Sequence, residues 1–143
     1  MKRIAALRDL SDDHHQGLVL ARTAKQAGKG EGALSVEDAW DEVILKFEQE
    51  LEVHFQIEED FLIAPMKAVG EMELVHQLLD EHHRLRNFVT EGAERTAEAL
   101  EQFGLLLEQH IRFEERQFFE SAQVCLDDVT LKRVLEACAK RHA

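Results

Sequence analysis

Apolar residues recur along this chain at steps of three and four, the period of an amphipathic α-helix. A first helix is predicted to run to about Gln26, and a glycine-rich loop over residues 27–32 follows it. One face of this helix is predicted to carry Leu7, His14, Leu18 and Ala21. Ser35 is a typical N-cap for a second helix, which is expected to continue until Pro65 and Gly70 bracket a short connection.

The second half of the chain repeats this pattern. A third helix is predicted from about Glu71 to Thr90 and a fourth from about Thr96 to Glu120, while Asp127 and Asp128 can start a short fifth helix. Four long helices with short connections between them favour antiparallel neighbours. We therefore predict one all-α domain over residues 1–143, an up-down-up-down four-helix bundle with a short fifth C-terminal helix.

Each predicted long helix carries a histidine at or near the centre of its apolar face. These residues are His14 or His15, His54, His82 and His110. Two of these histidines are followed four residues later by a glutamate, as His54 is by Glu58 and His110 by Glu114. Positions i and i+4 lie about 6 Å apart on one helix face, so each pair can present an imidazole and a carboxylate to one point.

A single histidine on an apolar face is more often a hydrogen-bonded core residue than a ligand, so the positions of all four must be weighed together. His54 lies 11 residues before Pro65, and His82 lies 11 residues after Glu71, which places both at the same depth in the bundle. The other two histidines match this depth to within about one helical turn. Buried carboxylates need a partner or a metal ion, so a common layer predicts a metal site.

Composition narrows the chemistry of this site. The chain has 17 Lys+Arg against 29 Asp+Glu, a net charge of −12, which disfavours nucleic acid or an anionic membrane as a partner. Its N-terminus does not resemble a secretory signal, and its two cysteines suit reduced thiols in the cytoplasm. Imidazole and carboxylate ligands without cysteine fit iron, manganese or zinc, and two carboxylates able to bridge favour a pair of ions.

The histidine-bearing segments resemble the hemerythrin-like (HHE cation-binding) family from about Leu10 to Phe119. They are Asp13-His14-His15, His54 to Pro65, Glu81 to Leu85 and His110 to Glu115. The resemblance implies two non-haem iron ions with a bridging oxygen, held inside the bundle. It also implies that His54, His82 and His110 are terminal ligands and that Glu58 and Glu114 are bridges, with His14 or His15 as the ligand of the first helix.

One departure from the family's oxygen carriers bears on function. Carriers place two histidines one turn apart on the third helix, whereas the positions one turn from His82 are Leu78 and Arg86. A more open centre favours sensing or redox chemistry with O2 or NO over transport. Zinc or manganese could take the place of iron, and two other functions fit the same residues: a di-iron oxidoreductase acting on peroxide or NO, or a metal-free helical interaction module. No catalytic residue is assigned, and oligomeric state is not indicated.

Overall fold

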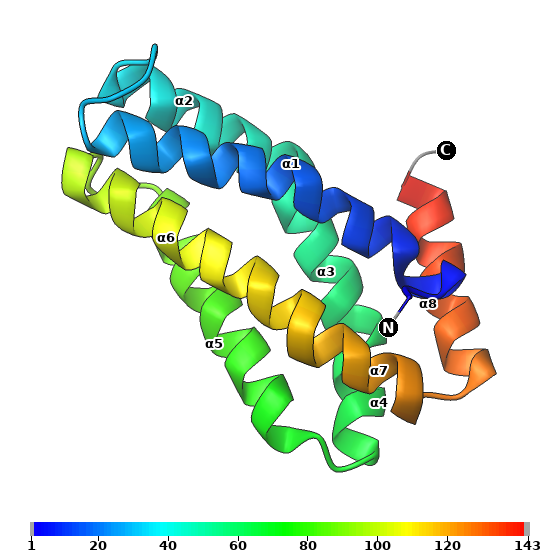
Figure 1. Cartoon of the computed structure of the whole chain (residues 1–143). Coiled ribbons are helices and arrows are strands. Elements are labelled where there is room, and N and C mark those ends of the chain that lie inside the picture. Colours follow the sequence, from blue (N-terminus) through cyan, green and yellow to red (C-terminus); the bar gives the residue numbers. More distant parts are fainter. Residues whose placement is uncertain (1, 142–143) are drawn as a thin grey trace.

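The computed structural model describes residues 2–141, which fold into antiparallel helical rods (Figure 1). The elements are α1 (Ala5–Gly28), α2 (Val36–Lys46), the π-helical turn η1 (Phe47–Leu51), α3 (Glu52–Phe61), α4 (Ile63–Ala68), α5 (Met72–Val89), α6 (Ala97–Phe113), the π-helical turn η2 (Glu114–Phe118), α7 (Phe119–Cys125) and α8 (Asp128–Arg141). Elements α2, η1 and α3 form one rod, and α6, η2 and α7 form another.

The rods pack as a four-helix bundle. Helix α1 lies against α2 and α6, α5 lies against α6, and α8 crosses one end of the bundle against α1 and α3 (Figure 1). The prediction of an all-α bundle with an additional C-terminal helix is therefore confirmed. Among the described residues, no helix combines the length and the apolar character needed to cross a membrane.

Three helices begin where the sequence predicted, because a polar side chain satisfies an amide of the first turn. Ser35 Oγ accepts a hydrogen bond of 3.0 Å from the Asp38 amide at the start of α2. Thr96 Oγ1 accepts one of 3.1 Å from the Ala99 amide at the start of α6. The Asp127 carboxylate accepts one of 2.8 Å from the Thr130 amide and starts α8 in the same way.

The predicted inner face of the first helix needs one correction. Leu18 is 41% exposed, and the neighbouring Gly17 is the residue that faces the bundle interior. A Cβ atom at Gly17 would lie 2.7 Å from Cδ1 of Ile111. The absence of a side chain at Gly17 thus allows α1 to approach α6 closely, and Leu18 is turned toward solvent.

The prediction that Pro65 begins the second connection is wrong. The helix breaks earlier, at Leu62, and α4 continues through Pro65 to Ala68. Pro65 occupies the first turn of α4, where the missing N–H removes no intrahelical hydrogen bond. The connection is therefore reduced to residues 69–71, which keeps α4 tightly joined to α5.

The buried apolar side chains form two separate clusters. One contains Leu10, Leu78 and Phe118, and the other contains Ala21, Leu85 and Phe103. Helices α1 and α5 each contribute to both clusters, with one buried histidine between their two contributions. The core is therefore divided by a polar layer at the level of these histidines.

Candidate metal centre

The polar layer contains four histidines and two glutamates from all four rods of the bundle. They are His14 of α1, His54 and Glu58 of α3, His82 of α5, His110 of α6 and Glu114 of η2. None of these side chains is more than 6% exposed. The predicted convergence of imidazole and carboxylate groups at one depth is confirmed.

The side chains form two groups, in each of which the possible ligand atoms all lie within 4.8 Å of one another. The groups are Glu58 with His82, His110 and Glu114, and His14 with His54 and Glu114. The imidazoles pair in the same way, with ring centroids 5.3 Å apart for His14 and His54 and 4.9 Å apart for His82 and His110. Glu114 belongs to both groups, and each group could hold a metal ion.

Each glutamate lies between the two groups. Nε2 of His54 is 3.1 Å from Glu58 Oε2, and Nε2 of His82 is 3.1 Å from Glu58 Oε1. On the opposite side of the layer, Glu114 Oε1 is 3.0 Å from Nε2 of His14 and 3.2 Å from Nε2 of His110. A carboxylate placed between imidazoles of two groups is the arrangement that a bridging ligand requires.

The hydrogen bonding of these atoms shows that the residues fit a metal ion. Both carboxylate oxygens of Glu58, Oε2 of Glu114 and Nε2 of His82 and His110 are buried without a hydrogen-bond partner. Buried polar atoms are almost always hydrogen-bonded, because leaving them unpaired is destabilising. A cation bound among these atoms would give each of them a partner, so their chemistry fits a metal ion.

The structure places two further histidines, His15 and His83, outside the cluster. His15 is exposed and belongs to neither group, because a step of about 100° along α1 takes it away from the face of His14. The choice that the sequence left open between these two is thus decided in favour of His14 as the residue in the cluster. His83 is exposed as well, on the outer face of α5.

A second set of four carboxylates surrounds the cluster, each facing the Nδ1 atom of one histidine. The separations are 2.7 Å from Asp13 to His54, 2.7 Å from Glu59 to His82, 2.7 Å from Glu81 to His110 and 3.7 Å from Glu115 to His14. At 2.7 Å, a carboxylate on Nδ1 fixes the ring orientation and leaves Nε2 to face the candidate metal position. Nδ1 of His14, at 3.7 Å from Glu115, has no hydrogen-bond partner, so the ring of His14 is held less firmly.

These four carboxylates link the helices in a closed ring, which we call the carboxylate ring. Each carboxylate contacts a histidine of the next helix: Asp13 of α1 contacts α3, Glu59 of α3 contacts α5, Glu81 of α5 contacts α6, and Glu115 of η2 contacts α1. Sequence patterns alone did not identify Asp13 and Glu81 as supporting groups. The available signal was their position: each of the four is next to a cluster residue in sequence, so it points toward the neighbouring helix.

The carboxylates also set the charge of the imidazoles. Burial opposes protonation of His54, but the carboxylates of Glu58 and Asp13 outweigh it and raise its pKa to about 9. Burial likewise favours the neutral form of Glu58, yet His54 and His82 hold the pKa of Glu58 well below its usual value. His110 differs, because burial outweighs the effect of Glu81 and lowers the pKa of His110 to about 4. In the metal-free protein, a protonated His54 therefore balances the Glu58 carboxylate.

The π-helical turn η2 brings the last glutamate into the layer. His110, Glu114 and Phe118 are all buried, although two successive steps of four residues would rotate a regular α-helix by about 80°. The wider turn of η2, over Glu114–Phe118, absorbs this rotation. The helix can thus present both His110 and Glu114 to the cluster and still bury Phe118 in the core.

Solvent approaches the layer from the side of α1 and η1. A groove of about 610 Å³ between these elements is lined by Asp13, Gly17, Leu51 and His54, among others. The same four residues border an inner void of about 10 Å³, which also touches His14, His110 and Glu114. A void of this size is at the lower limit for one water molecule, so it can admit only a very small ligand.

Comparison with known proteins gives one finding. The family model described as Hemerythrin HHE cation binding domain matches residues 5–122 of the chain. No curated protein and no solved structure matches the chain. The matched region contains every residue of both groups and of the carboxylate ring, and it ends before α8.

Proposed function

This chain belongs to the hemerythrin HHE cation-binding domain family, and from that membership we propose that it holds two non-haem iron ions and binds O2 or NO in sensing or redox chemistry. The observation that carries the proposal is the pair of buried glutamates. Glu58 and Glu114 each lie between imidazoles of two groups, and three of their four carboxylate oxygens have no hydrogen-bond partner.

The ligand set follows from the two groups. We propose that His14 and His54 bind one ion, that His82 and His110 bind the other, and that Glu58 and Glu114 bridge them. Iron in such a site supplies reversible redox chemistry and affinity for O2 and NO. The chain itself orients the imidazoles through the carboxylate ring and limits access to the small void beside His14 and His54.

The surroundings of His82 favour sensing or redox chemistry over oxygen transport. One turn away on either side lie Leu78, which is fully buried in an apolar cluster, and Arg86, which binds Glu52 and Glu59. Neither residue can supply the additional imidazole that the family's carriers have on this helix. The centre we propose is therefore incompletely coordinated by protein and open to exogenous ligands.

Metal analysis of freshly purified protein tests this proposal. We expect about two iron ions per chain after expression in iron-supplemented medium, with charge-transfer absorption in air that changes when NO is added to the reduced protein. A stoichiometric zinc content would retain the site but reject the redox function, and a stoichiometric manganese content would reject iron as the metal. A metal content near zero, unaffected by added iron, would reject the site itself.

The groove that reaches Asp13 and His54 favours a second candidate function, a di-iron oxidoreductase acting on peroxide or NO. Its volume of about 610 Å³ gives small reactants a path toward the layer. This function predicts repeated turnover of peroxide or NO in the presence of a reductant, and loss of turnover in Glu58→Ala. Binding of one equivalent without turnover would favour the sensing function.

We also propose that the described residues form one domain that functions in the cytoplasm. Val134 and Cys138 of α8 pack in the same apolar cluster as Leu10 and Met66, which joins α8 to the bundle. Cys125 and Cys138 are both free thiols, which suits a reducing compartment.

A further inference from the structure

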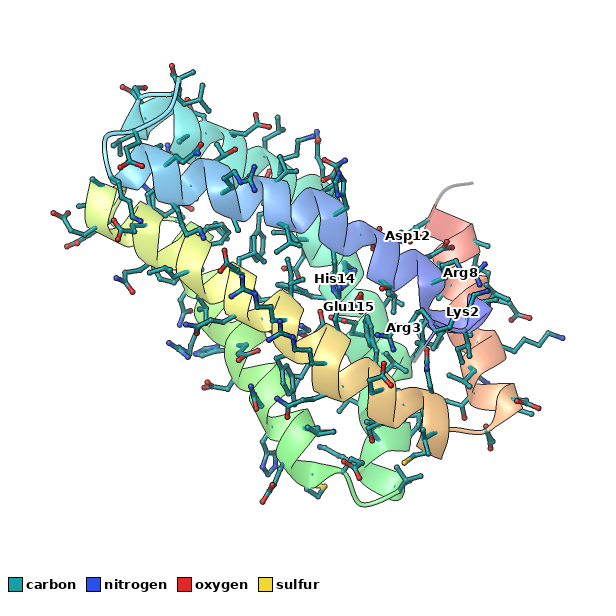
Figure 2. All side chains as sticks on the ribbon, in the orientation of Figure 1. Lys2, Arg3, Arg8, Asp12, His14 and Glu115 are labelled. Atoms are coloured by element: carbon teal, nitrogen blue, oxygen red, sulfur yellow. The ribbon has the colours of Figure 1, made fainter. Side chains whose placement is uncertain are left out.

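Two members of the carboxylate ring bind arginines that lie outside the family-matched region. Arg141, the last residue of α8, donates hydrogen bonds of 2.7 and 3.0 Å to the two carboxylate oxygens of Asp13. Arg3, which precedes α1, donates to Glu115 through a 2.9 Å bond to its carbonyl oxygen and a 3.3 Å bond to its carboxylate. Figure 2 shows Arg3, Glu115 and His14 lying together where α1 faces η2.

Both arginines contact carboxylates that lie behind the same proposed cation position, that of His14 and His54. Asp13 and Glu115 face His54 and His14, the imidazoles of one group. The carboxylates behind the other two histidines are held from within the matched region, since Arg86 donates to Glu59 at 2.7 Å and Gln77 donates to Glu81 at 3.2 Å. Ser11, within the matched region, also donates to Glu115, so the half of the cluster with His14 and His54 is supported from both inside and outside the matched region, and the other half from inside it.

The link from α8 to the cluster is short and partly shielded from solvent. Asp13 Oδ2 lies 2.7 Å from Nδ1 of His54 and 2.7 Å from Nη1 of Arg141, so one oxygen atom joins the arginine to the imidazole. The side chain of Arg141 is 12% exposed. A two-point arginine–carboxylate contact fixes the direction of the carboxylate as well as its position, and this direction sets the orientation of the His54 ring.

We propose that Arg3 and Arg141 are positioning residues for the cation position of His14 and His54, and that filling this position is coupled to the docking of the N-terminal segment and α8. The inference rests on the proposed two-ion site. Linkage requires the coupling to act in both directions: a docked α8 strengthens metal binding, and bound metal strengthens the docking of α8 by the same factor.

A titration of the metal-free full chain with Co²⁺, followed by visible absorption and by competition with a chelator, tests the first direction. In the wild type we expect two binding steps. Arg141→Gln should weaken one step about tenfold and change its absorption band, because partners behind a ligand contribute about 10–100-fold to metal affinity. Arg141→Lys, which retains the charge, should restore part of the loss. Unchanged affinity and absorption in Arg141→Gln would overturn the proposal.

Two matched arginine variants separate positioning from general effects of charge. Arg133→Gln removes an exposed arginine from the same helix and should leave both steps unchanged. Arg86→Gln should weaken the step assigned to His82 and leave the other as it was. If Arg133→Gln reproduces the effect of Arg141→Gln, the effect comes from net charge and the proposal fails.

A double variant tests whether Arg141 acts through Asp13. In an Asp13→Asn background, Arg141→Gln should cause little further loss of Co²⁺ affinity, because the group it orients is already altered. If Arg141 only anchored α8, its replacement by Gln would lower the stability of the protein in the Asp13→Asn background as well, and the loss of Co²⁺ affinity would not depend on Asp13. Full additivity of the two losses in Co²⁺ affinity would therefore reject the positioning role.

Hydrogen exchange of the wild-type protein tests the second direction and depends on no variant. Amides of α8 should exchange about tenfold more slowly when Co²⁺ is bound, by reciprocity with the expected loss of affinity. Exchange in α8 that is indifferent to bound Co²⁺ would overturn the coupling. Absence of Co²⁺ binding in the wild type would instead reject the proposed function, so the two failures are distinguishable.

Discussion

At the scale of single residues, each histidine of the cluster uses its two ring nitrogens for different purposes. Nε2 faces the buried glutamates, and Nδ1 faces a carboxylate from another helix. A histidine held on only one side could rotate about its side-chain bonds, whereas one held on both sides has a fixed tautomer and orientation. The carboxylate ring is therefore as important to the cluster as the residues that face the cation positions.

Glu81 gives a direct test of this role. It is 8% exposed, and it lies 2.7 Å from Nδ1 of His110. We expect Glu81→Gln to weaken binding of one metal ion about tenfold, because the amide holds the imidazole less strongly than the carboxylate does. Chelator competition measures the loss. Glu73→Gln, at an exposed position of the same helix, is the control, and equal affinities in the two variants would contradict the role.

The protonation of His54 predicts how the stability of the metal-free protein depends on pH. Its pKa rises from 6.5 to about 9 on folding, so its contribution is complete below pH 6.5 and is lost as the pH rises through about 9. Chemical denaturation should therefore show falling stability over this interval. Metal binding requires neutral imidazole, so metal affinity should rise over the same interval. Metal-free stability that increases toward pH 9 would contradict the prediction.

At the scale of elements, the close approach of α1 and α6 brings His14 near Glu114. Gly104 of α6 lies against α1, and a Cβ atom there would be 2.7 Å from the carbonyl oxygen of Ala21. Gly28 makes a similar contact, with a Cβ atom 2.7 Å from the carbonyl oxygen of Ala97. Because both obstacles are backbone atoms, a side chain at either glycine would have to separate the helices.

Gly104→Ala should therefore destabilise the protein by about 1–3 kcal/mol, as overpacking of a core does. At a helix position without such contacts, the same replacement would stabilise the protein, because alanine is favoured over glycine by about 1 kcal/mol. Denaturant titration measures the change, with Gln102→Ala on the exposed face of α6 as the control. A higher denaturation midpoint for Gly104→Ala would show that the helices are not in close contact.

Periodicity predicted the helical rods well, but local departures from regular geometry were harder to anticipate. The bundle and the starts at Ser35 and Thr96 follow from amphipathic spacing and capping chemistry, which are local properties. The π-helical turns, η1 and η2, were not predicted. Their signal is two successive steps of four, at Val43, Phe47 and Leu51 and again from His110 to Phe118, a spacing that a regular helix would not keep on one face.

The inner residues of the candidate site were easier to predict from the sequence than the residues that support them. The inner residues could be found because histidine and glutamate on an apolar face conflict with burial. Asp13 and Glu81 carry only the weak signal of standing next to a cluster residue, since their partners lie on other helices. Arg141 carries no such signal, and its contact with Asp13 spans 128 positions in sequence. Such contacts depend on the packing of whole helices.

At the scale of the whole molecule, two apolar clusters enclose one charged layer. The layer contributes little hydrophobic stabilisation of its own, and three of the four carboxylate oxygens of Glu58 and Glu114 have no hydrogen-bond partner in the metal-free protein. Metal binding and folding should therefore be strongly linked, because the unfolded chain cannot assemble ligands from four helices.

Thermal unfolding with and without metal measures this linkage. A free metal concentration 100 times the dissociation constant should stabilise the protein by about 2.7 kcal/mol per site, which raises Tm by several degrees. Glu58→Leu should abolish most of this increase, while Glu48→Leu, at an exposed position of the same rod, should preserve it. A wild-type Tm that is insensitive to iron and to Co²⁺, with a more stable Glu58→Leu variant, would indicate a metal-free helical module.

The closed course of the carboxylate ring has a consequence for protein engineering. Each of the four rods supplies a supporting acid to one neighbour and receives one from another. Grafting any single helix onto a foreign scaffold would break two of these connections, so the centre cannot be transplanted piece by piece. A minimal synthetic version must carry all four segments together, each with its acid beside its inner ligand, and the order of the segments around the bundle must be preserved.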